Sequence, residues 1–371
     1  MKILSIKTLF ALIMIFSPIT SHAGVDQNIN DFLAPISKII SSIVFYSLPL
    51  GSANVELIVI WLIAGGIFST IYFRFINFTG FKHAVELVSG KFSSKDSEGE
   101  VSHFRALATA LSGTVGLGNI GGVAVAISLG GPGATFWMIL SGLIGMSLKF
   151  CECTLGVKYR NINPDGSVSG GPMYYLDIAL TKKGMGFLGK TLGVLYAIFI
   201  IGGAFGGGNM FQANQSYALV GSLTGISSLA YGIILAILVG AVIIGGIERI
   251  GQTTEKIVPT MVVLYVGASL FVILTNLDKL GGVVASIMSE AFSPNAIYGG
   301  LIGVLVTGIK RAVFSNEGGV GSASIAHSAA KTDEPVREGI VAMVGPFIDT
   351  IIVCFMTASV ILITKDTNPL Y

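Results

Sequence analysis

Long apolar stretches alternate with short polar segments along most of this chain of 371 residues. The stretches lie near residues 55–73, 106–129, 134–155, 188–208, 229–247, 258–277, 298–326 and 340–364. A helix needs about 20 mostly apolar residues to cross the hydrocarbon core of a bilayer. The pattern therefore predicts an all-α integral membrane protein, with about eight spans that make up a transmembrane domain over residues 55–371.

Two segments precede this domain. Residues 1–23 combine two lysines, a short apolar run and a small-residue end, which is typical of a cleavable signal peptide. An uncleaved anchor helix is the alternative, although the apolar run is shorter than a span. Residues 24–54 are predicted to form an external amphipathic segment that Pro35 and Pro49 break.

Composition agrees with residence in a bilayer. Hydrophobic residues make up 52% of the chain and charged residues only 11%, and the mean hydropathy is +0.80. The 49 glycines favour closely packed or interrupted helices. The net charge of +2 includes no basic block of the kind that binds nucleic acid. Cys151, Cys153 and Cys354 lie in apolar stretches, so we interpret them as packing residues.

Basic residues predict the orientation. The loops that hold most of the Lys and Arg residues are 74–105, 158–190, 249–256 and 331–337. The intervening segment 209–228 holds none, and 276–295 holds one lysine. Because basic loops stay on the cytoplasmic side, we expect a multi-pass protein of the cell (inner) membrane whose mature N-terminus lies outside the cytoplasm.

The second apolar stretch is interrupted by Gly113-Thr114-Val115-Gly116-Leu117-Gly118-Asn119-Ile120-Gly121-Gly122. Irregular backbone at membrane depth survives where it lines a cavity or is buried in protein, and in transporters it carries the substrate and its coupling ion. A half-helix that starts near Asn119 would point its positive end at an anionic group such as a carboxylate. Close helix packing through Gly118 and Gly122 is the alternative.

This break supplies the first half of a candidate binding site. Its substrate- and ion-binding candidates are Thr114, Gly116, Gly118, Asn119 and Gly121. Backbone carbonyls and the Thr114 hydroxyl are hard oxygen ligands that suit sodium. We therefore place a sodium ion near Thr114, Gly116 and Asn119.

A second irregular segment, Ser315-Asn316-Glu317-Gly318-Gly319-Val320-Gly321, falls within another apolar stretch. Its Asn-x-Gly-Gly-Val sequence repeats the one that begins at Asn119. Paired broken helices of opposite direction are typical of inverted-repeat transporters. The candidates here are Ser315, Asn316, Glu317 and Gly318.

Further polar groups lie at membrane depth. Lys310 and Arg311 precede the second break, where each charge costs about 2.5–3.5 kcal/mol on insertion scales, so they need partners or water. Glu317 is the nearest acid in sequence, and Glu152 and Asp349 lie on other spans. We interpret the pair as either a structural ion pair or a coupling or gating charge.

Asn209 and Gln212 are spaced to share one helical face, where their amides could bind a zwitterion or only contact a neighbouring helix. Among the histidines, His83 and His103 are expected to be solvated in a cytoplasmic loop, and His327 is either structural or part of a gate. No nucleophile, base and orienting acid occur at informative spacing, so we do not expect an enzyme.

Several motifs together resemble one family, the alanine or glycine:cation symporters, also called sodium:alanine symporters. They begin with Gly116-Leu117-Gly118-Asn119-Ile120-Gly121-Gly122-Val123-Ala124, Gly130-Gly131-Pro132-Gly133-Ala134-Thr135-Phe136-Trp137-Met138 and Gly170-Gly171-Pro172-Met173-Tyr174-Tyr175. The last is Lys310-Arg311-Ala312-Val313-Phe314-Ser315-Asn316-Glu317-Gly318-Gly319. The resemblance runs from about Ile36 to the end of the chain.

The resemblance implies a leucine-transporter-like inverted-repeat helical bundle with one extra N-terminal span. It also implies inward symport of alanine, glycine or a similar small neutral amino acid by alternating access, driven by sodium or by protons. No other cofactor and no nucleic-acid partner are implied. Because the family has about eleven spans, we expect the second repeat to be incomplete here, as in a truncated product. A non-transporting ligand-binding membrane protein or an inactive remnant is the alternative.

Overall fold

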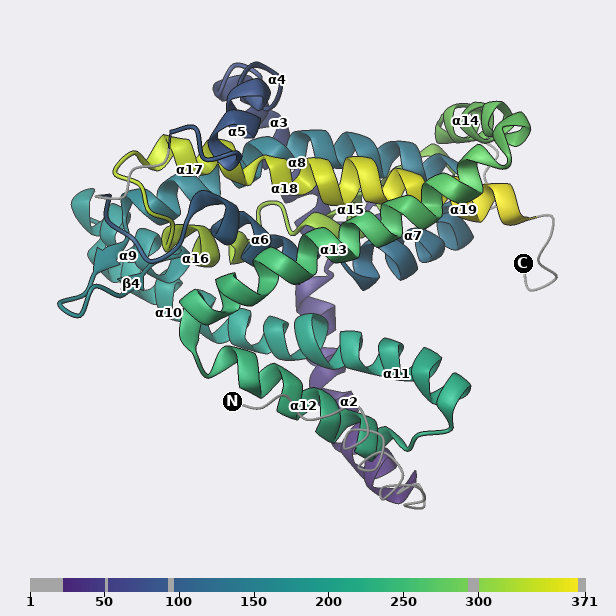
Figure 1. The fold of residues 1–371 in the computed structure, drawn as a ribbon, viewed down its shortest axis with the longest axis horizontal. Helices are drawn as coiled ribbons and strands as arrows, with labels where there is room; N and C mark the ends of the chain where they lie inside the picture. The colour runs from purple at the N-terminus through teal and green to yellow at the C-terminus, as the bar shows by residue number, and fades with distance from the viewer. Residues whose placement is uncertain (1–22, 51–52, 93–96, 293–299, 366–371) are drawn as a thin grey trace. The chain divides into compact units, whose positions relative to one another are not determined.

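The structure is a computed structural model that describes residues 23–50, 53–92, 97–292 and 300–365. Nearly all of the predicted signal peptide therefore lies outside the described residues. The chain divides into two compact units (Figure 1). One unit includes residues 1–46 and 201–246, and the other includes residues 47–200 and 247–371.

The smaller unit is helical in its described part. It holds α2 (Ala23–Val44), the end of α10 (Gly186–Gly203), the π-helical segment η1 (Ala204–Met210), α11 (Phe211–Thr224) and α12 (Ser228–Ile243). The prediction that Pro35 breaks the N-terminal amphipathic segment is wrong, since α2 continues through it. Proline removes one backbone donor and bends a helix without having to end it. Pro49 does lie outside α2, in a short strand.

The larger unit contains the other elements. Its helices in the first half of the chain are α3 (Leu57–Tyr72), α4 (Ile76–Thr79), α5 (Phe81–Val88), α6 (His103–Thr114), α7 (Leu117–Gly130), α8 (Gly133–Lys158), α9 (Pro172–Lys182) and most of α10. Those in the second half are α13 (Gly246–Leu274), α14 (Leu277–Ala291), α15 (Gly300–Asn316), α16 (Ser322–Ser328), α17 (Pro335–Ala342), α18 (Val344–Pro346), the π-helical η2 (Phe347–Cys354) and α19 (Phe355–Thr364). Two antiparallel hairpins complete it: β1 (Ser47–Leu50) with β2 (Ala53–Glu56), and β3 (Asn161–Ile162) with β4 (Val168–Ser169).

Each of the eight apolar stretches is helical over most of its described residues, so the all-α membrane fold class is confirmed. Four helical segments within the described residues are long and apolar enough to span a bilayer: Gly133–Lys158, Gly186–Thr224, Gly246–Leu274 and Pro335–Thr364. The bent pair α6–α7 would be a fifth. Leu57–Tyr72 and Ser228–Ile243 are shorter apolar helices. The number of eight spans stays a prediction.

Helix α8 is the centre of the larger unit. Helices α3, α14, α15, α16 and α17 and the segment η2 all pack against it, and α7, α8 and α15 run side by side in Figure 1. Glycine permits the closest contact, because a Cβ on Gly308 of α15 would lie 2.5 Å from the Ala134 carbonyl oxygen on α8. Such small-residue contacts are how helices associate where no water drives them together.

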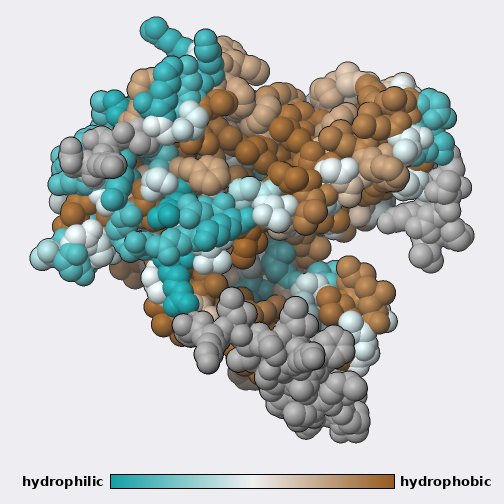
Figure 2. Space-filling view, viewed as in Figure 1, coloured by the Kyte–Doolittle hydropathy of each residue, from teal (hydrophilic) through white to brown (hydrophobic). Residues whose placement is uncertain are grey.

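The two ends of α8 meet different parts of the larger unit. At its start, the Trp137 indole donates to the Ala291 carbonyl at the end of α14, at 2.9 Å. Just beyond its end, the Arg160 guanidinium donates to carbonyls of the segment 328–332. Figure 2 shows hydrophilic residues gathered over this second end and hydrophobic residues over the middle of the unit. The polar end thus brings together parts of three predicted cytoplasmic loops.

Candidate functional site

The first break is shorter than predicted. Helix α6 ends at Thr114 and α7 begins at Leu117, two residues before the expected Asn119, with a bend of 41° between them. Gly118 and Gly121 are therefore helical. A Cβ on Gly118 would lie 3.1 Å from the Ser315 Cα atom, so Gly118 allows α7 to pack closely on α15. The packing alternative describes Gly118, while Val115 and Gly116 form the irregular backbone between the two helices.

The second break covers five residues between Asn316, where α15 ends, and Ser322, where α16 begins. Glu317 has a φ of 53°, and Gly319 and Gly321 have φ values of 85° and 88°. A left-handed glutamate is uncommon because its Cβ crowds the backbone, and such strain is concentrated at functional sites. The Ser322 hydroxyl donates to the Glu317 carboxylate and helps to hold this turn.

Asn119 joins the two broken helices. Its Oδ1 accepts a hydrogen bond from the Gly116 backbone N–H at 2.7 Å, which closes the first break. Its Nδ2 donates to Ser315 Oγ at 2.9 Å and to the Asp349 carbonyl oxygen at 2.8 Å. Asn119 and Ser315 are completely buried. The pairing predicted from the repeated sequence is thus a direct contact between the breaks.

Asn316 forms the next layer of this polar cluster. Its Oδ1 accepts from the Gly318 backbone N–H at 2.8 Å, and its Nδ2 donates to Thr350 Oγ1 at 3.1 Å. The Thr350 hydroxyl in turn bonds the Asp349 carboxylate through Oδ1. The other carboxylate oxygen, Asp349 Oδ2, is buried and has no hydrogen-bond partner.

A buried ion pair lies on α8 beside the second break. Lys149 Nζ is 3.3 Å from Glu152 Oε1, and both side chains are more than nine-tenths buried. Glu152 Oε2 accepts from the Gly321 backbone N–H at 2.9 Å, so this carboxylate supports the strained turn. The angle of the Lys149–Glu152 contact does not make it a hydrogen bond, and Lys149 Nζ has no partner of that kind.

These groups border a small cavity. Thr114, Lys149, Asn316, His327 and Asp349 contribute polar atoms to its wall, and apolar residues of α6, α16 and α17 complete it. Its volume of about 10 Å³ is that of a single water-sized sphere. Asp349 and Lys149, the one with an unpaired carboxylate oxygen and the other with an ammonium group, therefore belong to the wall of the same small cavity.

Comparison with known proteins identifies the family of the chain. The sequence profile of the sodium:alanine symporter family matches residues 41–369. The chain belongs to this family. The resemblance that the four motifs suggested is thereby confirmed, and members of the family are symporters rather than enzymes.

Individual relatives are similar over most of this chain. The sodium/alanine symporter AgcS of Methanococcus maripaludis is 46% identical over 303 residues, which are 81% of this chain and 66% of that protein. The putative sodium/proton-dependent alanine carrier protein YrbD of Bacillus subtilis is 38% identical over 84% of this chain and 62% of its own length. The probable sodium/glutamine symporter GlnT of Bacillus subtilis is 36% identical over 83% and 63%. The chain spans about two thirds of the length of these relatives.

In this sodium:alanine symporter family member, the charges before the second break have other partners than the sequence indicated. Lys310 forms an ion pair with Glu56 at the end of β2, and not with Glu317, Glu152 or Asp349. The Lys310 side chain is 39% exposed, so the pair lies at the edge of the unit. Arg311 is half-buried and has no ion-pair partner within the described residues. Lys310 therefore forms an ion pair, but with a partner that is distant in the sequence.

The amide pair lies in the smaller unit. Asn209 belongs to η1 and Gln212 to α11. Because η1 is π-helical, with more residues per turn than an α-helix, the expected α-helical spacing of the two amides does not hold across it. π-Helical segments are frequent at functional sites, so the segment itself is informative.

The histidine expectations need correction. His83 lies in helix α5 rather than in a loop, and its side chain is 42% exposed beside Glu86. His103 is not solvated: its side chain is 3% exposed and contacts the buried Glu338 carboxylate. His327 contacts the same carboxylate. Loop charge predicted the wrong surroundings for His103 because residue 103 begins helix α6.

Sequence reasoning missed Lys149 altogether. A lysine within an apolar stretch is a signal that could have found it, because such residues mark ion and substrate pathways. The described residues hold no cluster of three or more His, Cys, Asp or Glu side chains suited to a metal ion. Sodium does not need one, since hydroxyl, carbonyl and single carboxylate oxygens are its usual ligands.

Proposed function

We propose that the protein moves a small neutral amino acid, such as alanine or glycine, into the cell together with a sodium ion. The observation that carries the proposal is the contact between two broken helices beside the buried Asp349 carboxylate and the Lys149 ammonium, which lack hydrogen-bond partners at Asp349 Oδ2 and Lys149 Nζ. Family membership supports the same class of activity. The similarity to YrbD, a putative sodium/proton-dependent alanine carrier protein, keeps a proton as the alternative coupling ion.

We place the cation beside Asp349. Its Oδ2 is a buried anionic oxygen without a partner, and the Thr114 hydroxyl lines the same cavity. An unpaired carboxylate at membrane depth is costly, and a bound cation would remove that cost. The Asn119 amide is already occupied by Gly116, Ser315 and the Asp349 carbonyl, so we assign it the role of fixing the two breaks. This keeps the sodium near Thr114 and Gly116.

Lys149 is the group that we assign to the substrate carboxylate. Its ammonium lines the cavity and is held only by Glu152. A zwitterion has one carboxylate and one ammonium group, and the cavity offers one group of each opposite sign. With Asp349, Glu152 and Lys149 ionised, the site carries one net negative charge. A bound sodium ion cancels this charge and a zwitterionic substrate leaves it unchanged, so binding of both favours closing the site away from water.

Transport then requires a change of conformation, because a cavity of about 10 Å³ cannot admit alanine. We propose alternating access, in which the paired breaks α6–α7 and α15–α16 move apart. A leucine-transporter-like inverted repeat would relate these two broken helices, and their opposite directions and shared Asn-x-Gly-Gly-Val sequence support it.

Uptake of radiolabelled alanine into proteoliposomes that contain the full chain tests the proposal. An inward sodium gradient should produce accumulation above equilibrium, and an equal potassium gradient should not. A protonophore should leave sodium-driven accumulation intact if sodium is the coupling ion, and should abolish it if the proton is. Glycine in excess should compete.

Three outcomes would decide against it. Alanine binding without gradient-driven accumulation would indicate a ligand-binding membrane protein or an inactive remnant. Uptake that never exceeds equilibration would indicate a passive pathway. Accumulation that only bulky or charged amino acids inhibit would move the substrate class away from small neutral amino acids.

A further inference from the structure

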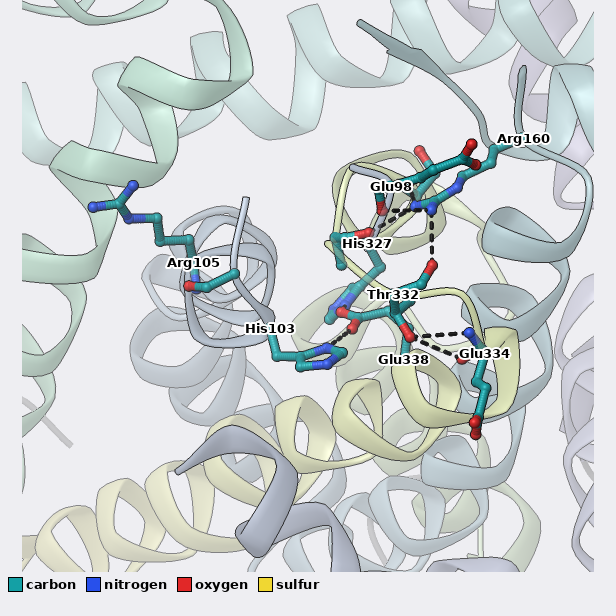
Figure 3. A network of polar contacts seen from close by, with 11 residues as sticks. Glu98, His103, Arg105, Arg160, His327, Thr332, Glu334 and Glu338 are labelled. Atoms are coloured by element: carbon teal, nitrogen blue, oxygen red, sulfur yellow. Dashed lines mark hydrogen bonds and ion pairs between the residues drawn. The ribbon is translucent and has the colours of Figure 1, made fainter. Parts of the chain in front are cut away.

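Two buried histidines share one buried carboxylate at the polar end of the larger unit. His103 Nδ1 contacts Glu338 Oε2, and His327 Nδ1 contacts Glu338 Oε1 (Figure 3). The side chains of His103, His327 and Glu338 are 3%, 1% and 0% exposed, respectively. They come from the start of α6, the end of α16 and the start of α17. The cluster therefore ties together one end of each broken helix.

We propose that His103, Glu338 and His327 form a proton-binding site that locks the ends of α6 and α16 together. The two contacts require two protons. An ionised carboxylate only accepts hydrogen bonds, so the Nδ1 atom of each histidine must carry the hydrogen that it donates. With both rings neutral, the cluster would carry one negative charge away from water. A third proton, on the second nitrogen of one ring, makes the cluster neutral.

The neighbouring charges do not neutralise the cluster instead. Arg160 interacts electrostatically with Glu338, but its guanidinium donates to backbone carbonyls of Glu98 and of the segment 328–332, and it also faces the Glu98 and Asp333 carboxylates. Lys149, which shares the cavity with His327, is paired with Glu152. Arg105 of α6 points to Glu255, at 2.7 Å. Because burying an unpaired charge is costly, the proton is the group that balances Glu338.

Backbone hydrogen bonds beside the cluster connect the same parts of the chain that the lock holds together. The Lys331 N–H donates to the Val101 carbonyl at 2.7 Å, and the Glu100 N–H donates to the Ala329 carbonyl at 2.8 Å. The segment before α6 is thus bonded to the segment after α16, directly beside the cluster. Loss of the proton leaves a buried negative charge in the closed form, whereas water solvates it in the open form. A rise in pH therefore favours opening.

Hydrogen exchange of the full chain in detergent tests this between about pH 5.5 and 8.5, the range in which histidine titrates. After correction for intrinsic rates, the protection of the Lys331 and Glu100 amides should fall about tenfold per pH unit, the slope of one linked proton. This slope should extend from the pH at which the open form releases the proton to the higher pH at which the closed form releases it, and protection should be constant above that. Glu338→Gln should remove that slope, because a glutamine accepts from one ring, donates to the other and needs no third proton. His83→Gln, at a partly exposed position of α5 outside the cluster, should keep the slope.

The inference fails if protection of the unmodified chain does not depend on pH, or if Glu338→Gln retains the full slope. Nitrogen NMR of the unmodified chain with ¹⁵N-labelled histidine decides the matter should Glu338→Gln not fold. One buried imidazole per molecule should have both ring nitrogens protonated below the transition. Two neutral buried rings throughout would overturn the proposal. Neither measurement depends on transport, so the proposed function stands or falls separately.

Discussion

The Asp349 carboxylate lies near the two breaks, and its buried surroundings satisfy only part of its hydrogen-bonding capacity. Thr350 bonds one carboxylate oxygen, while Oδ2 has no partner in a nearly water-free site. Buried polar groups without a partner are rare in folded proteins because each one costs free energy. A ligand that supplies the missing interaction would therefore be bound more tightly than the same ligand at a satisfied group.

Asp349→Asn should weaken sodium binding without enlarging the side chain. Charged interactions of this kind contribute about 1.5–3 kcal/mol, so the sodium concentration for half-maximal alanine uptake should rise about ten- to a hundredfold. Initial uptake rates in proteoliposomes, measured over a sodium series, give this value. Asp165→Asn, in the exposed hairpin between α8 and α9, is the matched control and should leave it unchanged. Unchanged sodium dependence in Asp349→Asn would contradict the cation site.

At the scale of elements, glycine sets how closely helices approach. Gly308 of α15 faces the backbone of α8, where a Cβ would lie 2.5 Å from the Ala134 carbonyl oxygen and 2.7 Å from Trp137 Cβ. Neither neighbour is the flexible end of a side chain. By contrast, Gly267 on α13 has nothing within 4 Å of an added Cβ.

Gly308→Ala should therefore push α15 away from α8 and destabilise the protein by about 1–3 kcal/mol, the range for overpacked sites. A lower midpoint of thermal unfolding in detergent would report this. Gly267→Ala should leave the midpoint unchanged or raise it slightly, because alanine favours helix and meets open space. Equal midpoints for the two variants would refute the close contact between the helices.

The elements also show which features the sequence could predict. Apolar length is a local property, so the positions of α6, α8 and α19 followed from it. The start of α13 did not, because this helix begins at Gly246 and includes residues 249–256, which were predicted to form a loop. The extent of the first break did not, because glycines serve helix packing as well as chain breaks, and only the contact of Gly118 with Ser315 separates the two uses.

Contacts between residues that are far apart in the sequence were the least predictable. The ion pair of Lys310 with Glu56 and the contacts of Glu338 with His103 depend on how distant helices pack. Nothing in the neighbouring sequence encodes that packing. The repeated Asn-x-Gly-Gly-Val sequence was the exception, since it linked Asn119 to the second break before any contact was known.

At the scale of the whole molecule, α8 separates two ends of the larger unit. Its 26 residues correspond to about 39 Å at 1.5 Å per residue, which is enough to cross a bilayer. The end of α14 lies beside its start, and the hairpin β3–β4 follows its end. The distribution of basic residues predicts that the hairpin end is cytoplasmic.

Two exposed aspartates make this orientation testable. Asp165 lies in the hairpin β3–β4, and Asp278 lies in the first turn of α14, within the segment 276–295 that is predicted to be external. In intact cells, a membrane-impermeant thiol reagent should label Asp278→Cys and should label Asp165→Cys only after permeabilisation. The unmodified chain gives the background, because Cys153 and Cys354 are buried and Cys151 is half-buried. The reverse labelling pattern would mean that the orientation in the membrane is opposite to the predicted one. The His103–Glu338–His327 lock would then lie at the outer face of the membrane and would respond to external rather than cytoplasmic pH.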